Sequence, residues 1–169
     1  DRAVAPPRFR KDMTRDSLEG FLFPASYEFT QRTTARELVA DQLAAFRDRF
    51  STVDLAYART RNLTPYDILI IASMIEKETA IPRERRLVSA VIYNRLRHRM
   101  PLGIDATIRY GLDIPGTKSL TKEALRSPSP FNTRINAGLP PTPIANPGLA
   151  SIRAAANPAR VAYLYYVRK

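Results

Sequence analysis

Two glutamates separated by one lysine, Glu76-Lys77-Glu78, have the residue types and spacing for acid–base chemistry. A protonated carboxyl group can donate a proton to a leaving group, and the resulting carboxylate can take one from a nucleophile. An apolar environment disfavours the charged form and so raises the pKa of the group, which suits a general acid. Which glutamate has such an environment depends on the segment that carries them.

Residues 64–79 predict a buried helix. Thr64 can cap its start, Pro65 suits the first helical position, and Asp67 can complete a capping box. Eight of the ten residues from Tyr66 to Ile75 are apolar, so we expect the helix to be buried nearly all round. The two acids fall in its last turn, where the helix macrodipole disfavours negative charge.

Helical geometry places the two acids differently. At about 100° per residue, Glu78 shares the centre of the apolar stripe with Ile71 and Ile75, whereas Glu76 lies near its edge. This arrangement favours Glu78 as the general acid. The alternative is that the helix frays into solvent at Glu76 and that Glu78 pairs with an arginine, and the helix alone leaves it open.

The composition excludes several kinds of catalytic centre. The 169 residues contain no Cys, which excludes disulfides, thiol catalysis and Cys-ligated metals. The single His, His98, lies among arginines, which argues against a Ser-His-Asp triad or a multi-His zinc site. We expect His98 to be exposed, and we expect no metal and no cofactor.

The net charge of +11 favours a polyanionic partner, such as nucleic acid, anionic lipid or an acidic cell-wall polymer. No apolar run reaches the roughly 18 residues that span a bilayer. The chain begins at Asp1, so an upstream anchor is compatible with the sequence. Dinucleotide and phosphate-loop fingerprints are absent from the sequence.

The periodicity and the turn residues predict an α+β fold. Residues 1–16 are charged and carry little periodicity, which predicts a linker or the tail of another domain. An arginine-rich face of the third helix is predicted to be solvated surface. In chain order we expect a helix from Thr34 with a Thr34/Glu37 capping box, the helix at 64–79, a third at 83–99, a strand or hairpin at 101–111, a brief helix at 121–126, an ordered Pro-rich loop, a helix at 149–156 and a strand at 163–167.

An ordered series of motifs runs from about residue 17 to the end of the chain. They are Leu18-Glu19-Gly20, Ala72 to Thr79, Val91 to Leu96, Asp105 with Thr107, Tyr110-Gly111, Ser129 to Thr133, Gly138 to Gly148 and Tyr163 to Val167. In this order they resemble the MltG/YceG-like family of endolytic murein transglycosylases. Each motif alone is moderately specific, and the set is highly specific. The sequence departs from the family at Gly103 and Ala106, where Gln and Pro are common.

The resemblance implies a mainly helical, lysozyme-like catalytic core with a small sheet at residues 17–169, preceded by the tail of a LysM-like module at 1–16. The family continues past Lys169. The resemblance also implies a bacterial enzyme anchored through an N-terminal segment on the extracytoplasmic face of the cytoplasmic membrane. Its substrate would be the glycan strands of peptidoglycan, with cell-wall synthases as further partners and with no nucleic acid.

The family's catalytic residue is the second acid of its Glu-Lys-Glu-Thr motif, which corresponds to Glu78. The implied reaction cleaves the β-1,4 bond from N-acetylmuramic acid to N-acetylglucosamine without water. Glu78 protonates the leaving oxygen, and its carboxylate then takes the proton of the muramoyl C6 hydroxyl, which closes a 1,6-anhydro ring. One carboxyl group suffices because the substrate supplies the nucleophile.

Five further residues are predicted to bind the substrate: Asn132, Thr107, Tyr110, Asp105 and Glu76. Each has a structural alternative. Asn132 and Asp105 can stabilise turns, Thr107 and Tyr110 can pack or pair in a strand, and Glu76 can pair with a basic residue of a neighbouring helix. At the level of the whole protein, two other functions stay open. They are a peptidoglycan-binding module without turnover and a basic nucleic-acid-binding protein, although no nucleic-acid motif is present.

Overall fold

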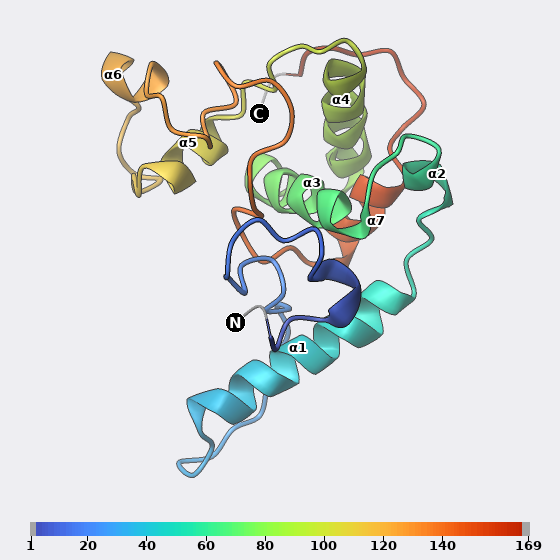
Figure 1. Cartoon of the computed structure of the whole chain (residues 1–169), viewed down its shortest axis with the longest axis vertical. Helices are drawn as coiled ribbons and strands as arrows, with labels where there is room; N and C mark the ends of the chain where they lie inside the picture. The colour runs from blue at the N-terminus through green and yellow to red at the C-terminus, as the bar shows by residue number, and fades with distance from the viewer. Residues whose placement is uncertain (1–2, 167–169) are drawn as a thin grey trace.

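The computed structural model describes residues 3–166, and every regular element in this range is a helix (Figure 1). None of these helices is both long enough and apolar enough to cross a membrane. The elements are the 3₁₀ turns η1 (Pro7–Phe9) and η2 (Pro82–Glu84) and the helices α1 (Ala35–Ser51), α2 (Ala56–Arg59), α3 (Pro65–Glu78), α4 (Arg85–Arg97), α5 (Asp105–Gly111), α6 (Lys122–Leu125) and α7 (Leu149–Ala156).

Helix α3 lies at the centre of the molecule, with α4, α5 and α7 packed against it (Figure 1). The predicted capping box is confirmed: Thr64 Oγ1 accepts from the Asp67 N–H, and the Asp67 carboxylate accepts from the Thr64 N–H. Apart from Asp67, every residue from Tyr66 to Ile75 is buried. The apolar composition of α3 therefore reflects its central position.

An aromatic cluster joins the N-terminal segment to α1. Phe9 packs edge-on against Phe21 and Phe50, with ring centroids 5.2 and 5.0 Å apart, and Phe46 completes the cluster. Each such aromatic pair contributes roughly 0.5–1.5 kcal/mol beyond its buried area. Helix α1 begins with the predicted capping box at Thr34, which is confirmed. Phe9 and Phe21, which precede α1, thus pack into the same core as that helix.

The Pro-rich loop packs on α3 and on the N-terminal segment. Asn146 Oδ1 accepts from the N–H groups of Gly20 and Leu22, at 2.8 and 3.1 Å. The Ile144 N–H donates to the buried Ser73 Oγ of α3 at 3.0 Å. The prolines restrict the conformations that the loop can adopt when unfolded. The three hydrogen bonds satisfy backbone N–H groups of the N-terminal segment and of the loop itself.

The prediction of an α+β fold is wrong, because residues 3–166 form no strand. The segment expected as a hairpin at 101–111 carries α5 instead. Ile104 and Ile108 are both buried, and their spacing of four suits a helix face as well as it suits a strand. Before α5, the Gly103 N–H donates to the Thr133 carbonyl, a single bond that starts no ladder.

The strand expected at 163–167 is also not formed in the described part of the segment, residues 163–166; Val167 lies outside the described residues. The segment has no regular secondary structure, and two of its carbonyls accept hydrogen bonds from side chains. Asn94 donates to Tyr163 and Arg95 donates to Leu164, both from α4. Side chains from a helix replace the neighbouring strand that a sheet would supply.

The other helices expected from the sequence are confirmed. The brief helix at 121–126 is α6, capped by Thr121, and the helix expected at 149–156 is α7. The third helix begins as η2 and continues as α4. His98 is the exposed C-cap of α4.

Candidate active site

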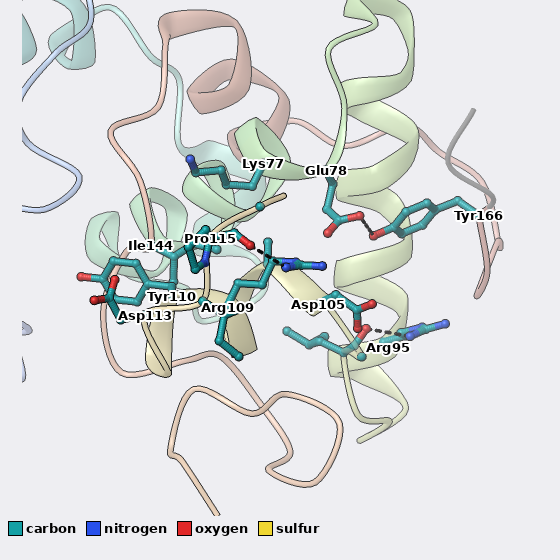
Figure 2. Close-up of a pocket in the computed structure, with 15 residues that line it drawn as sticks. Lys77, Glu78, Arg95, Asp105, Arg109, Tyr110, Asp113, Pro115, Ile144 and Tyr166 are labelled. Carbon is teal, nitrogen blue, oxygen red and sulfur yellow. Dashed lines mark hydrogen bonds between the residues drawn. The ribbon is translucent and has the colours of Figure 1, made fainter. Parts of the chain in front are cut away.

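A cavity of about 800 Å³ opens at the C-terminal end of α3. Its walls come from α3, α4, α5, the segment after α5, the Pro-rich loop and the C-terminal segment (Figure 2). The lining residues are Lys77, Glu78, Arg95, Leu102, Gly103, Asp105, Ala106, Arg109, Tyr110, Asp113, Ile114, Pro115, Gly116, Ile144 and Tyr166. Three of the residues predicted from the sequence, Glu78, Asp105 and Tyr110, are therefore brought together here.

Glu78 is the last residue of α3 and is partly buried at the wall of the cavity. Its Oε2 accepts a hydrogen bond of 2.9 Å from the hydroxyl of Tyr166 (Figure 2). The helix therefore carries the carboxyl group to the cavity, and a side chain 88 positions later in the sequence meets it there.

Tyr166 stays protonated beside this carboxylate. Burial raises the pKa of its phenol, and the negative charge of Glu78 raises that pKa further. A phenol with a raised pKa keeps its proton at neutral pH and remains a hydrogen-bond donor. No local sequence pattern predicts this role for Tyr166, although the residue lies in one of the motifs that resemble the family.

Two neighbouring residues of α4 hold the segment that carries Tyr166. Asn94 Nδ2 donates to the carbonyls of Val161 and Tyr163, both at 2.9 Å. Arg95 Nε donates to the Leu164 carbonyl at 2.7 Å. Arg95 belongs to the face of α4 that the sequence predicts to be solvated, and here its guanidinium binds backbone.

The same guanidinium also fixes the opposite wall of the cavity. Arg95 Nη1 donates to the Leu102 carbonyl at 2.7 Å, just before α5. Its planar fork lies over the ring of Tyr165, with its Cζ 5.1 Å from the centroid. One side chain thus joins the two segments that flank Glu78.

Glu76 faces away from this arrangement. Its Oε2 accepts from the Gly148 N–H at 3.1 Å, and Gly148 is the N-cap residue of α7. A carboxylate at this position accepts from an N–H at the start of α7 and interacts favourably with the positive end of the helix dipole. Its partner among the described residues is backbone rather than the basic side chain expected from the sequence.

Thr107 and Asn132 are fully buried. Thr107 Oγ1 donates to the Ile104 carbonyl at 2.7 Å and lies 3.0 Å from Thr133 Oγ1. The Asn132 amide donates to two backbone carbonyls of the preceding turn, at 3.1 and 2.8 Å. Both side chains therefore hold the loops behind the cavity, and their contact with substrate stays a prediction.

Asp105 and Tyr110 belong to α5 and line the cavity. The Asp105 carboxylate accepts from Arg134 through Nε and Nη2, at 3.0 and 2.7 Å, and both side chains are about half exposed. Tyr110 leaves 38% of its surface exposed and packs its ring on Phe131, 5.1 Å between centroids. These two side chains are reachable by a ligand.

A further carboxyl group, Glu19, lies near the Lys77 and Tyr110 side of the cavity. Burial raises its pKa, and the positive charge of Lys77 lowers it in part. The nearby negative charge of Glu19 also adds to the effect of burial in raising the pKa of Tyr110. In the described range no group of three or more His, Cys, Asp or Glu side chains has the arrangement of a metal site.

Comparison with known proteins places this geometry in a family. The model of the YceG-like family matches residues 3–169. The chain belongs to the YceG-like family. A crystal structure of a YceG-like protein from Listeria monocytogenes superposes with a TM-score of 0.77 at 32% identity, covering 93% of this chain and 53% of that one.

Two curated relatives carry the name endolytic murein transglycosylase. The protein of Bacillus subtilis is 34% identical over 161 residues, and that of Streptococcus pneumoniae strain R6 is 36% identical over 157 residues. The matches cover 95% and 90% of this YceG-like chain but 44% and 28% of the relatives. The chain thus spans less than half the length of either relative.

Proposed function

We propose that this chain acts as an endolytic lytic transglycosylase on the glycan strands of peptidoglycan, with Glu78 as the one acid–base group. The observation that carries the proposal is the position of Glu78, at the end of a buried helix and in the wall of an 800 Å³ cavity. Cavities of roughly 300–1,000 Å³ are typical of small-ligand sites. The relatives named endolytic murein transglycosylase add support.

In the proposed reaction, protonated Glu78 donates to the oxygen that leaves with N-acetylglucosamine while the C1–O bond breaks. Positive charge develops at C1 of N-acetylmuramic acid, as in other glycosidic cleavages. The Glu78 carboxylate then takes the proton of the C6 hydroxyl on the same sugar. The C6 oxygen bonds to C1, which closes a 1,6-anhydro ring and restores the protonated acid.

A single carboxyl group is sufficient for this route because the nucleophile is part of the substrate. Intramolecular attack replaces the positioned water that a hydrolase must hold, and its effective molarity is high. Asp105 and Tyr110 are open to the cavity and are the best placed of the predicted binding residues to contact the sugars. Thr107, Asn132 and Glu76 would act through the loops and the helix that they hold.

The proposal extends to the surroundings of the enzyme. The net charge of +11 would favour encounter with the carboxylates and phosphates of the cell wall, and high salt would weaken it. We propose that residues 17–169 form the catalytic domain of a longer bacterial protein, anchored on the extracytoplasmic face of the cytoplasmic membrane. Cell-wall synthases are the partners proposed for the whole protein.

Mass spectrometry of purified glycan strands after incubation with the chain tests the reaction. Fragments with 1,6-anhydro-muramic ends support the proposal, and Glu78→Gln serves as the inactive control. Reducing ends would instead identify a hydrolase. Glycan binding without cleavage would identify a binding module, and salt-sensitive nucleic-acid binding without glycan binding would favour the nucleic-acid alternative.

A further inference from the structure

The hydrogen bond between Tyr166 and Glu78 joins the end of α3 to the C-terminal segment (Figure 2). Tyr166 and the described residues just before it, from 161 on, belong to no helix and no strand. Its position therefore depends on what holds that segment. Asn94 and Arg95 supply three hydrogen bonds to the carbonyls of residues 161, 163 and 164.

We propose that Tyr166 is a positioning residue for Glu78: its hydroxyl orients the carboxyl group and stabilises the carboxylate that remains after proton donation. Asn94 and Arg95 contribute by presenting Tyr166 at the right place. This inference rests on the proposed function, because it assigns a role in the same proton transfers. Neither the helical position of Glu78 nor the motif that contains it requires such a partner.

The chemistry of a phenol suits this role. The hydroxyl is a donor toward Glu78 throughout the cycle because burial and the neighbouring carboxylate both raise the pKa of Tyr166. It does not enter the proton balance: the proton of Glu78 goes to the leaving oxygen, and the proton of the C6 hydroxyl returns to Glu78. A donor that favours the charged form makes Glu78 a stronger acid for the first step.

The anchors on α4 explain why the partner comes from so distant a segment. Asn94 and Arg95 follow one another at the end of α4, so they face different directions on the helix. Asn94 reaches residues 161 and 163, while Arg95 reaches residue 164 and the carbonyl of Leu102. The result is a short segment held at three carbonyls directly before Tyr166.

Other ionisable groups line the same cavity as Glu78. The ionisable groups that line the cavity with it are Lys77 on α3, Arg95 on α4, Asp105, Arg109 and Tyr110 on α5, and Asp113 after α5. A substitution of Tyr166 by Phe leaves all of these charges in place. The change in the behaviour of Glu78 then reports the lost hydroxyl.

The experiment compares Tyr166→Phe with the wild-type chain by the pH dependence of kcat/KM for release of anhydro-muramic fragments. The alkaline limb of this profile reports loss of the acid proton in the free enzyme. Loss of a donor to the carboxylate raises the pKa of Glu78, so this limb should move upward by about one pH unit. Because the weakened acid slows the first step, kcat should also fall about tenfold.

The matched control is Tyr163→Phe, which removes a hydroxyl from an exposed ring of the same segment. We expect an unchanged profile for it. Asn94→Ala should shift the limb in the same direction as Tyr166→Phe but less far, and should add little to it in the double variant. An unshifted limb in Tyr166→Phe, or a full further shift in the double variant, would overturn the inference.

A second measurement separates this inference from the proposed function. Carbon-13 labelling of the glutamate side chains allows the titration of Glu78 to be followed by NMR without substrate. An upward shift of its pKa in Tyr166→Phe supports the hydrogen bond as argued, whereas equal pKa values contradict it. If wild-type protein forms no anhydro ends, the proposed function fails, while the NMR result still decides whether Tyr166 controls Glu78.

Discussion

The last turn of α3 has two sides that use a glutamate in different ways. On the α7 side, Glu76 accepts from the backbone N–H of Gly148 and closes the contact between two packed helices. On the cavity side, Glu78 accepts from the hydroxyl of Tyr166, in a wall built from a short helix and chain without regular secondary structure. The two residues are identical in type and lie two positions apart, yet only one of them lines the cavity.

The difference shows how packing gives two neighbouring glutamates different surroundings. A backbone N–H at a helix start holds the carboxyl group of Glu76 in place, which suits a structural contact. The hydroxyl of Tyr166 is a neutral donor, and the carboxyl group of Glu78 that it meets lies beside a cavity large enough for a ligand. The same residue type therefore acquires a different role through the group that meets it.

The largest effect is expected from Glu78→Gln, which removes the acid and keeps the shape. Cleavage of glycan strands should fall by about 10³-fold or more, since no other carboxyl group replaces the lost proton donor. Thermal unfolding should show a free energy of unfolding within about 1 kcal/mol of wild type. If Glu78→Gln cleaved glycan strands at rates close to wild type, the distinction between a structural Glu76 side and a catalytic Glu78 side would be wrong.

A second substitution tests the Pro-rich loop, which contacts Glu76 through Gly148 and lines the cavity through Ile144. Ser73→Ala leaves the buried N–H of Ile144 without its acceptor, and Ile144 lines the cavity. The free energy of unfolding should fall by about 1–3 kcal/mol, measured by chemical denaturation. Activity should fall far less than in Glu78→Gln. A stability equal to that of wild type would mean that water satisfies the loop in place of α3.

Glu76→Gln tests the structural side directly. Glutamine can still meet the Gly148 N–H through its amide oxygen, but the charge at the start of α7 is lost. We expect a loss of about 0.5–1 kcal/mol in the free energy of unfolding, with kcat per folded molecule unchanged. A raised KM instead would show that Glu76 contacts substrate, as the sequence predicts.

The smallest expected effect concerns Glu19, whose pKa burial raises. Because the pKa of Glu19 is higher in the folded state than in the unfolded state, the protonated side chain stabilises the fold. This stabilisation is fully present below the pKa of the unfolded state and is lost as the pH rises through the pKa of the folded state. Glu19→Gln should therefore stabilise the chain near pH 7 by less than about 1 kcal/mol, because solvent screens a partly exposed group.

Denaturation of Glu19→Gln at two pH values provides the check. Near pH 3 both forms carry a neutral side chain, so their stabilities should agree. A destabilised variant near pH 7 would show that the attraction of Lys77 outweighs the burial of Glu19. The cavity side would then depend on the attraction between these two charges.

Local chemistry explains which parts of the fold were predictable. The starts of α1 and α3 follow from capping residues within four positions of each other, and both capping boxes formed. Helix α5, which formed where a strand or hairpin was predicted at 101–111, was not predictable because the spacing of Ile104 and Ile108 fits a helix and a strand equally. The strand predicted at 163–167 does not form in its described part, residues 163–166, where side chains of α4 donate to two of the carbonyls.

The sequence by itself determined α3, the side of it on which Glu78 lies, and the exclusion of thiol and disulfide chemistry. These depend on residue types and on spacings of a few positions, which the helical period converts into geometry. Tertiary structure decided that Glu76 would hold α7 and that Tyr166 would meet Glu78. Those contacts join residues 72 and 88 positions apart, and no local pattern encodes a contact that forms only when the whole core packs.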